Sequence, residues 1–208
     1  MLLRDGAFAC ASEGLIIRAA GRQAHAAYPE QGSNPIPLLG GLAAALPGLI
    51  GSMHPTGLLM ATPVGLQAGG RNFGVSAGEG ELCLTLRASL AGELQALERA
   101  MESHLAAQGG DFSWTLERQD VFPETVNHPA VFARCSALLD EMGTPCLALP
   151  QPMRWSEDFG WYLQRIPGLY LGFGAGENWP GLHTDAYYFN DALLEPCAAL
   201  LLDLLRRY

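Results

Sequence analysis

The alternation of strand and helix patterns over residues 14–119 constrains the fold more than any other feature of the chain. Residues 81–89 place leucine at every second position, which is the period of a half-buried strand, and residues 93–108 place apolar side chains on one helical stripe. The expected order is strand 14–20, helix from Pro35, strands 57–67 and 81–89, helix 93–108 and strand 112–117. This β-α-β-β-α-β order is typical of a ferredoxin-like sandwich, which closes its own core. We therefore predict a ferredoxin-like domain at residues 14–119.

Residues 120–208 follow a different pattern, in which helices and short strands alternate. The expected elements are helix 129–142, strand 146–149, helix 156–164, strand 168–174 and helix 191–207. Such alternation predicts an α/β domain with a parallel sheet, but two clear strands are fewer than the ~4 to 6 of a typical sheet. With residues 1–13, this part is predicted to be an incomplete α/β domain that carries the α+β ferredoxin-like insert. Either a partner supplies the missing strands or the chain is part of a larger protein.

Charge and cysteine content exclude several classes of protein. The chain has 12 basic residues, all arginine, against 21 acidic residues, and the net charge of −9 repels a phosphate backbone, so nucleic acid is not an expected partner. The 5 cysteines are odd in number and widely spaced, which favours free thiols in a reducing cytoplasm. We find neither a signal peptide nor an apolar run of the ~18 residues that a membrane span needs. A cytoplasmic protein that does not bind membranes is expected.

Two histidines lie in polar loops beside expected strands, where functional residues concentrate. They are His25 and His183, and the spacing His183-Thr-Asp185 offers two donors for a metal ion. A catalytic zinc site needs about three protein ligands, and the chain contains no H-E-x-x-H, Glu-Glu or Cys-x-His motif. The chain is therefore short of metal ligands. The alternative interpretation is that both histidines only satisfy local turns.

Acidic residues also cluster at the start of the expected helix 156–164. Ser156 suits the N-cap, and Glu157 and Asp158 suit the first helical turn, so helix capping explains this segment by itself. The functional alternative makes Glu157 or Asp158 a carboxylate that acts beside His183, either on the metal or behind a metal ligand. The glycine-rich stretch 69–74 spells neither a phosphate-binding loop nor a dinucleotide fingerprint.

Four motifs occur in the same order as in a known family. They are residues 21–29 around His25, residues 122–127, residues 156–170, and residues 182–191 around His183. With these motifs the chain resembles, over essentially its whole length, the dinuclear metal-dependent amidohydrolases and aminoacylases, the group of hippurate hydrolase and indole-acetyl-amino-acid hydrolase. The resemblance implies a ferredoxin-like lid and dimerisation domain inserted into an α/β metallopeptidase domain, and a homodimer formed through the lid.

The resemblance also implies roles for individual residues. His183 corresponds to the family's C-terminal metal ligand, and His25 to the lid histidine that reaches a neighbouring subunit's active site. There His25 would steady the tetrahedral oxyanion or the substrate carboxylate. Asn72 corresponds to a lid asparagine that contacts substrate, although the residues after it depart from the family's spelling, and Glu157 is the second substrate-binding candidate.

The family's N-terminal half, which carries most metal ligands and the general-base glutamate, has no counterpart in these residues. By resemblance the expected activity is hydrolysis of the amide bond in N-acyl amino acids, with two divalent ions, Zn or Mn, in the complete enzyme. The chain alone is expected to be inactive. The alternative is a truncated, non-catalytic paralogue that acts as a dimerisation or binding module.

Overall fold

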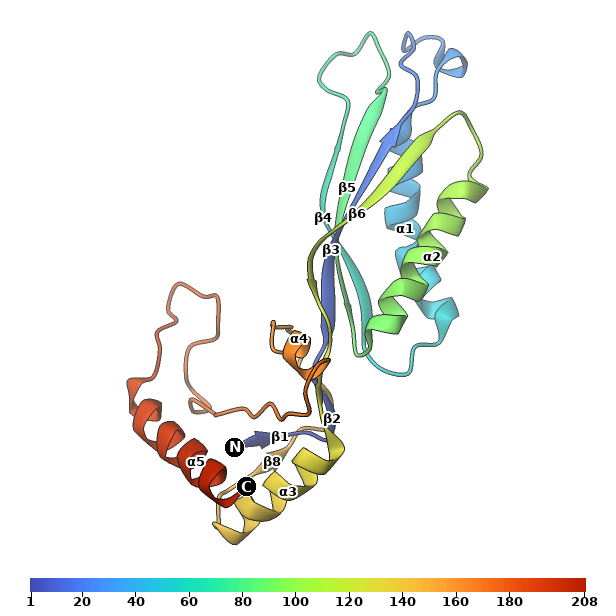
Figure 1. Cartoon of the computed structure of the whole chain (residues 1–208). Coiled ribbons are helices and arrows are strands. Elements are labelled where there is room, and N and C mark those ends of the chain that lie inside the picture. Colours follow the sequence, from blue (N-terminus) through green and yellow to red (C-terminus); the bar gives the residue numbers. More distant parts are fainter. The chain divides into compact units, whose positions relative to one another are not determined.

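One antiparallel sheet of four strands contains most of the extended backbone in the computed structural model, which describes residues 1–208 (Figure 1). Its strands are β3 (Ala11–Ala20), β4 (Leu59–Ala68), β5 (Glu79–Ala88) and β6 (Ser113–Phe122), and their spatial order is β4-β5-β3-β6. All neighbouring pairs are antiparallel. With the helices α1 (Pro35–Met53) and α2 (Ala91–Ala107), the chain order is β3-α1-β4-β5-α2-β6. The elements therefore follow one another as the sequence pattern predicts.

The core of this sheet lies on the face that both helices cover (Figure 1). Along β5, Leu82, Leu84 and Leu86 are buried and alternate with residues of intermediate exposure. Their partners on β3 include Leu15, which pairs with Leu84, and Ile17, which pairs with Leu82. Because side chains alternate across a strand, this register gathers the apolar residues of both strands against α1 and α2.

Two expectations for α1 are corrected by the structure. The sequence offers Ser33 or Asn34 as the helix cap, and Asn34 is the cap, since its Oδ1 accepts a hydrogen bond from the Ile36 N–H at 3.0 Å. The pair Pro47-Gly48 predicts that the helix ends or kinks there. The helix does not end at Pro47, because α1 continues to Met53 and packing of its leucines outweighs the missing hydrogen bond. The expectation of no span-length apolar run is also wrong. By length and composition alone, the 19-residue helix α1 is long and apolar enough to cross a membrane, although the core helix of a soluble protein passes the same test.

The chain divides into two units. Unit 2 comprises residues 9–124 and 154–158, and unit 1 comprises residues 1–8, 125–153 and 159–208. Unit 2 is wider than the insert expected at residues 14–119, because β3 and β6 both extend beyond the apolar positions that defined them in the sequence.

Unit 1 contains short strands and three helices. Its strands are β1 (Leu2–Leu3), β2 (Gly6–Ala9), β7 (Thr125–Asn127) and β8 (Leu147–Ala148), and its helices are α3 (Pro129–Glu141), α4 (Gly160–Leu163) and α5 (Leu194–Arg207). A 3-10 turn, Asp191–Leu193, precedes α5, and unit 2 contains another, Pro29–Gln31. β1 pairs with β8 in parallel, and β2 pairs with β7. Leu3, Leu139 and Leu204 form the buried cluster, which brings β1, α3 and α5 together.

The strand expected at residues 168–174 does not form. Only an isolated antiparallel bridge joins Gly172 to Leu2. The Asn127 side chain supplies hydrogen bonds that a neighbouring strand would otherwise make, because its Oδ1 accepts from the Tyr170 N–H at 2.6 Å and its Nδ2 donates to the Tyr170 carbonyl at 3.1 Å. A side chain that caps the backbone in this way removes the need for a ladder at this position.

Candidate functional site

Two loops at one end of the unit 2 sheet carry two of the predicted site residues. The loop after β3 holds His25, and the loop between β4 and β5 holds Asn72. His25 forms an antiparallel bridge with Val75. Backbone hydrogen bonds run from the Ala26 N–H to the Gly74 carbonyl at 2.9 Å and from the Ser76 N–H to the Ala24 carbonyl at 2.8 Å. Backbone hydrogen bonds therefore join the two loops, so that His25 and Asn72 lie on neighbouring, hydrogen-bonded segments.

The His25 ring has a defined hydrogen-bonding pattern. The Ala27 N–H donates to Nδ1 of His25 at 3.1 Å, so Nδ1 acts as the acceptor. In a neutral imidazole with an accepting Nδ1, the proton resides on Nε2. The side chain is exposed, and its centroid lies 5.7 Å from that of Tyr28. His25 thus presents an Nε2–H donor outside the loop.

Asn72 is held by its own turn. Its Oδ1 accepts a hydrogen bond from the Gly74 N–H at 3.0 Å, which is an Asx turn and leaves the amide NH₂ group as a donor. The residue is exposed and lines a cavity of about 420 Å³ together with Gln23 and Ser76. Asn72 is therefore placed to contact a small polar ligand.

His183 lies in the long loop that precedes α5 in unit 1. Its φ of 63° is in the left-handed region, and its side chain is exposed. The adjacent Leu182 lines a mainly apolar cavity of about 520 Å³, together with Phe173, Trp179 and Phe189. The residue before His183 therefore lines an apolar cavity, whereas His183 is not among the lining residues.

The residues present do not by themselves fit a metal centre. No group of three or more His, Cys, Asp or Glu side chains in residues 1–208 is arranged to hold an ion. His183 and Asp185 are both exposed, and no hydrogen bond or ion pair between them is seen. Glu157 belongs to unit 2, whereas His183 belongs to unit 1, so the predicted pairing of the two remains a prediction.

The segment that carries Glu157 is fixed to the sheet of unit 2, which corrects the helix expected at residues 156–164. Ser156 is not an N-cap, because α4 begins only at Gly160 and the Ser156 hydroxyl is hydrogen-bonded to that of Ser12. Arg87 donates to the Ser156 hydroxyl at 3.2 Å and to the Arg154 carbonyl at 3.0 Å. Ser12 and Arg87 are paired in register on β3 and β5, which is an arrangement that sequence spacing does not reveal.

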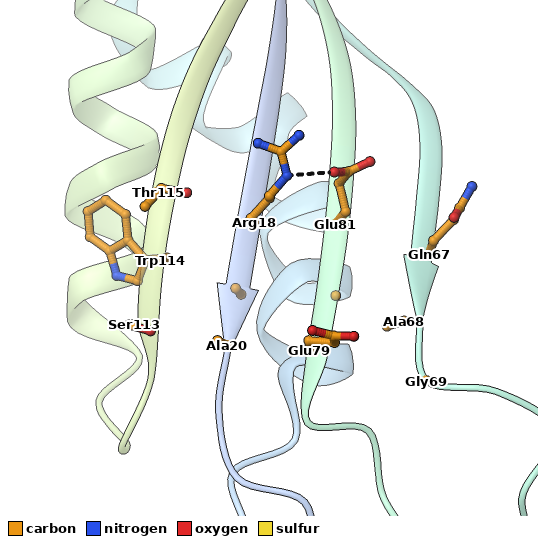
Figure 2. Close-up of a pocket in the computed structure, with 12 residues that line it drawn as sticks. Arg18, Ala20, Gln67, Ala68, Gly69, Glu79, Glu81, Ser113, Trp114 and Thr115 are labelled. Carbon is orange, nitrogen blue, oxygen red and sulfur yellow. Dashed lines mark ion pairs between the residues drawn. The ribbon is translucent and has the colours of Figure 1, made fainter.

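A further cavity of about 550 Å³ lies over the uncovered face of the sheet (Figure 2). Figure 2 shows Arg18 of β3 beside Glu81 of β5, and their ion pair measures 2.9 Å between Nε and Oε2. Arg18 also binds Glu117. No predicted site residue lines this cavity, and its arginine is paired with carboxylates.

A buried acid pair in unit 2 was not identified from the sequence. Arg118 donates from Nε to Oε1 of Glu98 at 2.6 Å and also binds the second oxygen of the same carboxylate. Oε2 of Glu13 lies 3.8 Å from Arg118 Nε, and Oε1 of Glu13 is buried without a partner. Burial, together with repulsion and hydrogen bonding from Glu98, raises the pKa of Glu13 to about 7. Only the tertiary structure shows this, because Glu13 and Glu98 are far apart in the sequence.

Comparison with known proteins identifies relatives of most of the chain. Residues 13–207 match peptidase family M20/M25/M40. An uncharacterised hydrolase, y4tI, of Sinorhizobium fredii is 35% identical over 81 residues, which are 38% of this chain and 20% of that protein.

Two solved structures share the fold of the whole chain. A protein from methicillin-resistant Staphylococcus aureus, provisionally named as an aminohydrolase, aligns with a TM-score of 0.85 at 19% identity over 99% of this chain and 54% of its own. The Bacillus subtilis YXEP protein, described as a dinuclear metal binding peptidase, aligns with a TM-score of 0.71 at 18% identity over 97% of this chain and 51% of its own. The chain thus spans about half the length of these proteins.

Proposed function

The chain belongs to peptidase family M20/M25/M40, and on that basis we propose that it is part of a metal-dependent hydrolase that cleaves the amide bond of N-acyl amino acids. The observation that carries this proposal is the extent of the family match, because residues 13–207 include both histidine loops. The Bacillus subtilis relative is described as a dinuclear metal binding peptidase, which supports hydrolytic chemistry with two ions.

In this proposal, unit 2 is the ferredoxin-like lid, and His25 acts on the developing negative charge. The accepting Nδ1 leaves a proton on Nε2, which is the atom that would donate to the tetrahedral oxyanion or to the substrate carboxylate. Asn72 would donate its free amide NH₂ group to the substrate, with Glu157 as a further substrate contact. The assignments of His25 and Asn72 rest on the exposed, paired loops and on the resemblance of their residues, and that of Glu157 rests on the resemblance alone.

His183 is proposed as a metal ligand in unit 1. Since no cluster of three donors is formed by residues 1–208, the remaining ligands of Zn or Mn and the general base would come from polypeptide outside these residues. The apolar cavity beside Leu182 suits an acyl group or an apolar amino-acid side chain.

We also propose a homodimer formed through unit 2. β6 is an edge strand of the sheet, with Val121 exposed, and unpaired strand edges are sites of association. All five cysteines are free thiols, which fits the proposed cytoplasmic location.

A non-catalytic, truncated paralogue is the second candidate. The observation that favours it is the lack of a three-donor cluster among residues 1–208. Addition of a metal-bearing half would restore hydrolysis under the first proposal and would leave this second candidate inactive.

The purified chain by itself tests the first part of the proposal. We expect it to bind less than one equivalent of zinc or manganese, measured by elemental analysis, and not to hydrolyse hippurate or acetyl-amino acids. Robust turnover by the chain alone would contradict the assignment of missing ligands to other polypeptide.

The role of His25 is tested in a complex that hydrolyses these substrates. Loss of one oxyanion donor lowers kcat by about 10²- to 10³-fold, so we expect this loss for His25→Ala. The matched control is His54→Ala, because His54 is also an exposed histidine of unit 2 but lies at the end of α1. Equal activity of the two variants would remove His25 from the proposed mechanism.

A further inference from the structure

Three elements of unit 2 meet at one cluster of charged side chains. The cluster consists of Glu13 of β3, Glu98 of α2 and Arg118 of β6, and we call its two glutamates the acid pair. The side chains of both glutamates are 7% exposed, whereas that of Arg118 is 56% exposed. Water therefore reaches the guanidinium but hardly reaches the two carboxylates, and such burial disfavours two negative charges side by side.

The acid pair shares its arginine unequally. Arg118 binds both oxygens of Glu98, and its Nε lies 2.6 Å from Oε1. Glu13 is held less well, because its Oε2 lies 3.8 Å from Arg118 Nε and its Oε1 is buried without a partner. The two acids can hydrogen-bond to each other when one of them holds a proton. An ionised Glu13 would instead be a second buried negative charge beside one guanidinium.

The surrounding elements do not supply a second balancing charge. The charged groups that act on Glu13 are Glu98 and Arg118. Glu102, which follows Glu98 by one turn of α2, is a further acid that acts on Arg118. α1 contains no charged residue, and the charged side chains of β5 alternate with its buried leucines and so lie on the uncovered face. Arg118 therefore balances one negative charge of the acid pair and leaves the other uncompensated.

The acid pair lies where the sheet is irregular. The pairing of β3 with β6 shifts register between Ser12 and Gly14, on either side of Glu13. β6 is an edge strand, so β3 is the strand that holds it. Unit 2 begins at residue 9 and its first segment ends at Glu124, so these strand ends are also where the chain enters and leaves the unit. The Ala91 N–H at the start of α2 donates to the Glu124 carboxylate at 3.1 Å, so side chains connect the helix to the strand ends.

We propose that the acid pair is a pH-sensitive switch, which holds the ends of β3 and β6 against α2 while the two acids share a proton and releases them when both acids are ionised. In the closed form the shared proton joins β3 to α2, and Arg118 joins α2 to β6. When the proton passes to water, the two carboxylates repel each other, and Glu13 can turn outward because the irregular pairing with β6 holds it weakly.

Burial, together with Glu98, raises the pKa of Glu13 to about 7, so the switch operates near neutral pH. Opening would free the last residues of unit 2 before the chain leaves it, at the starts and ends of the strands named above. The inference is independent of the proposed function, since no step of it involves a substrate or a metal ion.

Hydrogen exchange of the full chain at about pH 5.5 and about pH 8, corrected for the intrinsic pH dependence of exchange, tests the switch. We expect amides of residues 118–122, at the end of β6, to open at least about tenfold more often at the higher pH, because the shared proton is lost over this range. Since local opening exposes little surface, their exchange should hardly change with low concentrations of urea. Amides of residues 80–84 in β5 should exchange more slowly and should depend on urea, because β5 has a strand on both sides.

Substitutions within the acid pair test its part in the opening. Glu13→Gln keeps the shape of the protonated acid without titrating, so residues 118–122 should keep their low-pH protection at about pH 8. Glu98→Gln should move the response to lower pH, because Glu13 then has Arg118 without a competing carboxylate. The control is Glu79→Gln, which changes an exposed acid that lines the cavity over the uncovered face and should keep the wild-type response.

Three results would overturn the inference. The first is an NMR titration of the labelled carboxyl carbon of Glu13 in the wild-type chain with a midpoint below about pH 5, because the acid pair would then share no proton near neutral pH. The second is equal opening of residues 118–122 at both pH values. The third is one common exchange rate and one urea dependence for residues 118–122 and 80–84, because unit 2 would then open only as a whole.

Discussion

At the scale of single residues, the burial of Glu13 is the feature that the sequence indicates least, because acidic side chains are usually exposed. Glu13 lies where the pairing of β3 with β6 shifts register, between Ser12 and Gly14, and Asp120 on β6 has a left-handed φ of 48°. This irregularity accompanies an acidic side chain on the face that α2 covers, where it meets Glu98 and Arg118. One guanidinium cannot fully compensate two buried carboxylates, so the pair holds a proton at higher pH than either acid would alone.

We predict that unit 2 loses stability as pH rises from about 4.5 to about 7. The pKa of Glu13 is raised from 4.5 to about 7 in the folded state, so in this window the folded chain binds a proton that the unfolded chain releases. The stabilisation is fully present below pH 4.5 and is lost as pH rises through the folded pKa. Its upper bound is a few kcal/mol, at ~1.4 kcal/mol for each pKa unit. The effect is measured as the free energy of unfolding of unit 2 at each pH, from urea titrations in which hydrogen exchange of α2 reports on unfolding.

Glu13→Gln should flatten this pH dependence, because an amide does not titrate. Glu102→Gln is the control, since it removes the same charge at an exposed position of α2. An unchanged slope in Glu13→Gln would show that another group causes the pH dependence.

For the predicted site residues, the sequence shows that they lie in loops but not how those loops are folded. His25 and His183 were identified because both lie in polar loops beside apolar segments, which is visible in the sequence. The hydrogen bond from the Ala27 N–H, which fixes the proton on Nε2 of His25, depends on the conformation of the loop. No sequence pattern specifies that conformation.

At the scale of elements, the loop that carries His25 begins at a glycine with no space for a side chain. A Cβ on Gly21 would lie 2.0 Å from the Ser33 carbonyl oxygen, and Arg22 and Ser33 form a bridge at this point. Gly41 in α1 has the opposite environment, since it is exposed and a Cβ there would meet nothing within 4 Å. Glycine is therefore required by close backbone contact at position 21, whereas a side chain would fit at position 41.

We predict opposite effects when each of these glycines becomes alanine. Gly21→Ala should destabilise unit 2 by about 1 to 3 kcal/mol, because the backbone at Ser33 must move. Gly41→Ala should stabilise it by about 0.5 to 1 kcal/mol, because alanine is the better helix former. Urea unfolding of the two variants gives both values. Stabilisation by Gly21→Ala would show that the loop tolerates a wider approach to Ser33.

Elements with a strong apolar period were predicted more reliably than short ones. β5 and α2 carry leucines at strand and helix spacing over their whole length, and both form. The expected helix 156–164 shortened to Gly160–Leu163 because Ser12 and Arg87 hold Ser156 in another conformation. The expected strand 168–174 was replaced by side-chain bonds from Asn127 to Tyr170. Both changes come from residues distant in the sequence.

At the scale of the whole molecule, the two units differ in how much apolar surface they bury. We predict that amides of α2 and β5 exchange at least tenfold more slowly than those of α3 and α5 in the chain alone, a difference of ~1.4 kcal/mol or more in opening free energy. The reason is the larger core of unit 2. Hydrogen exchange with peptide-level resolution checks this, and equal protection of all four elements would contradict it.

The sequence by itself determined the order of strands and helices in unit 2 and the loop positions of the two histidines, because each depends on local spacing and residue type. The tertiary structure alone decided the unit boundaries, the buried Glu13–Glu98 pair and the exposure of leucines on α5. These features arise from contacts between residues far apart in the chain, or from the lack of such contacts. Local periodicity carries information on which face of an element is apolar, but not on whether another segment covers that face.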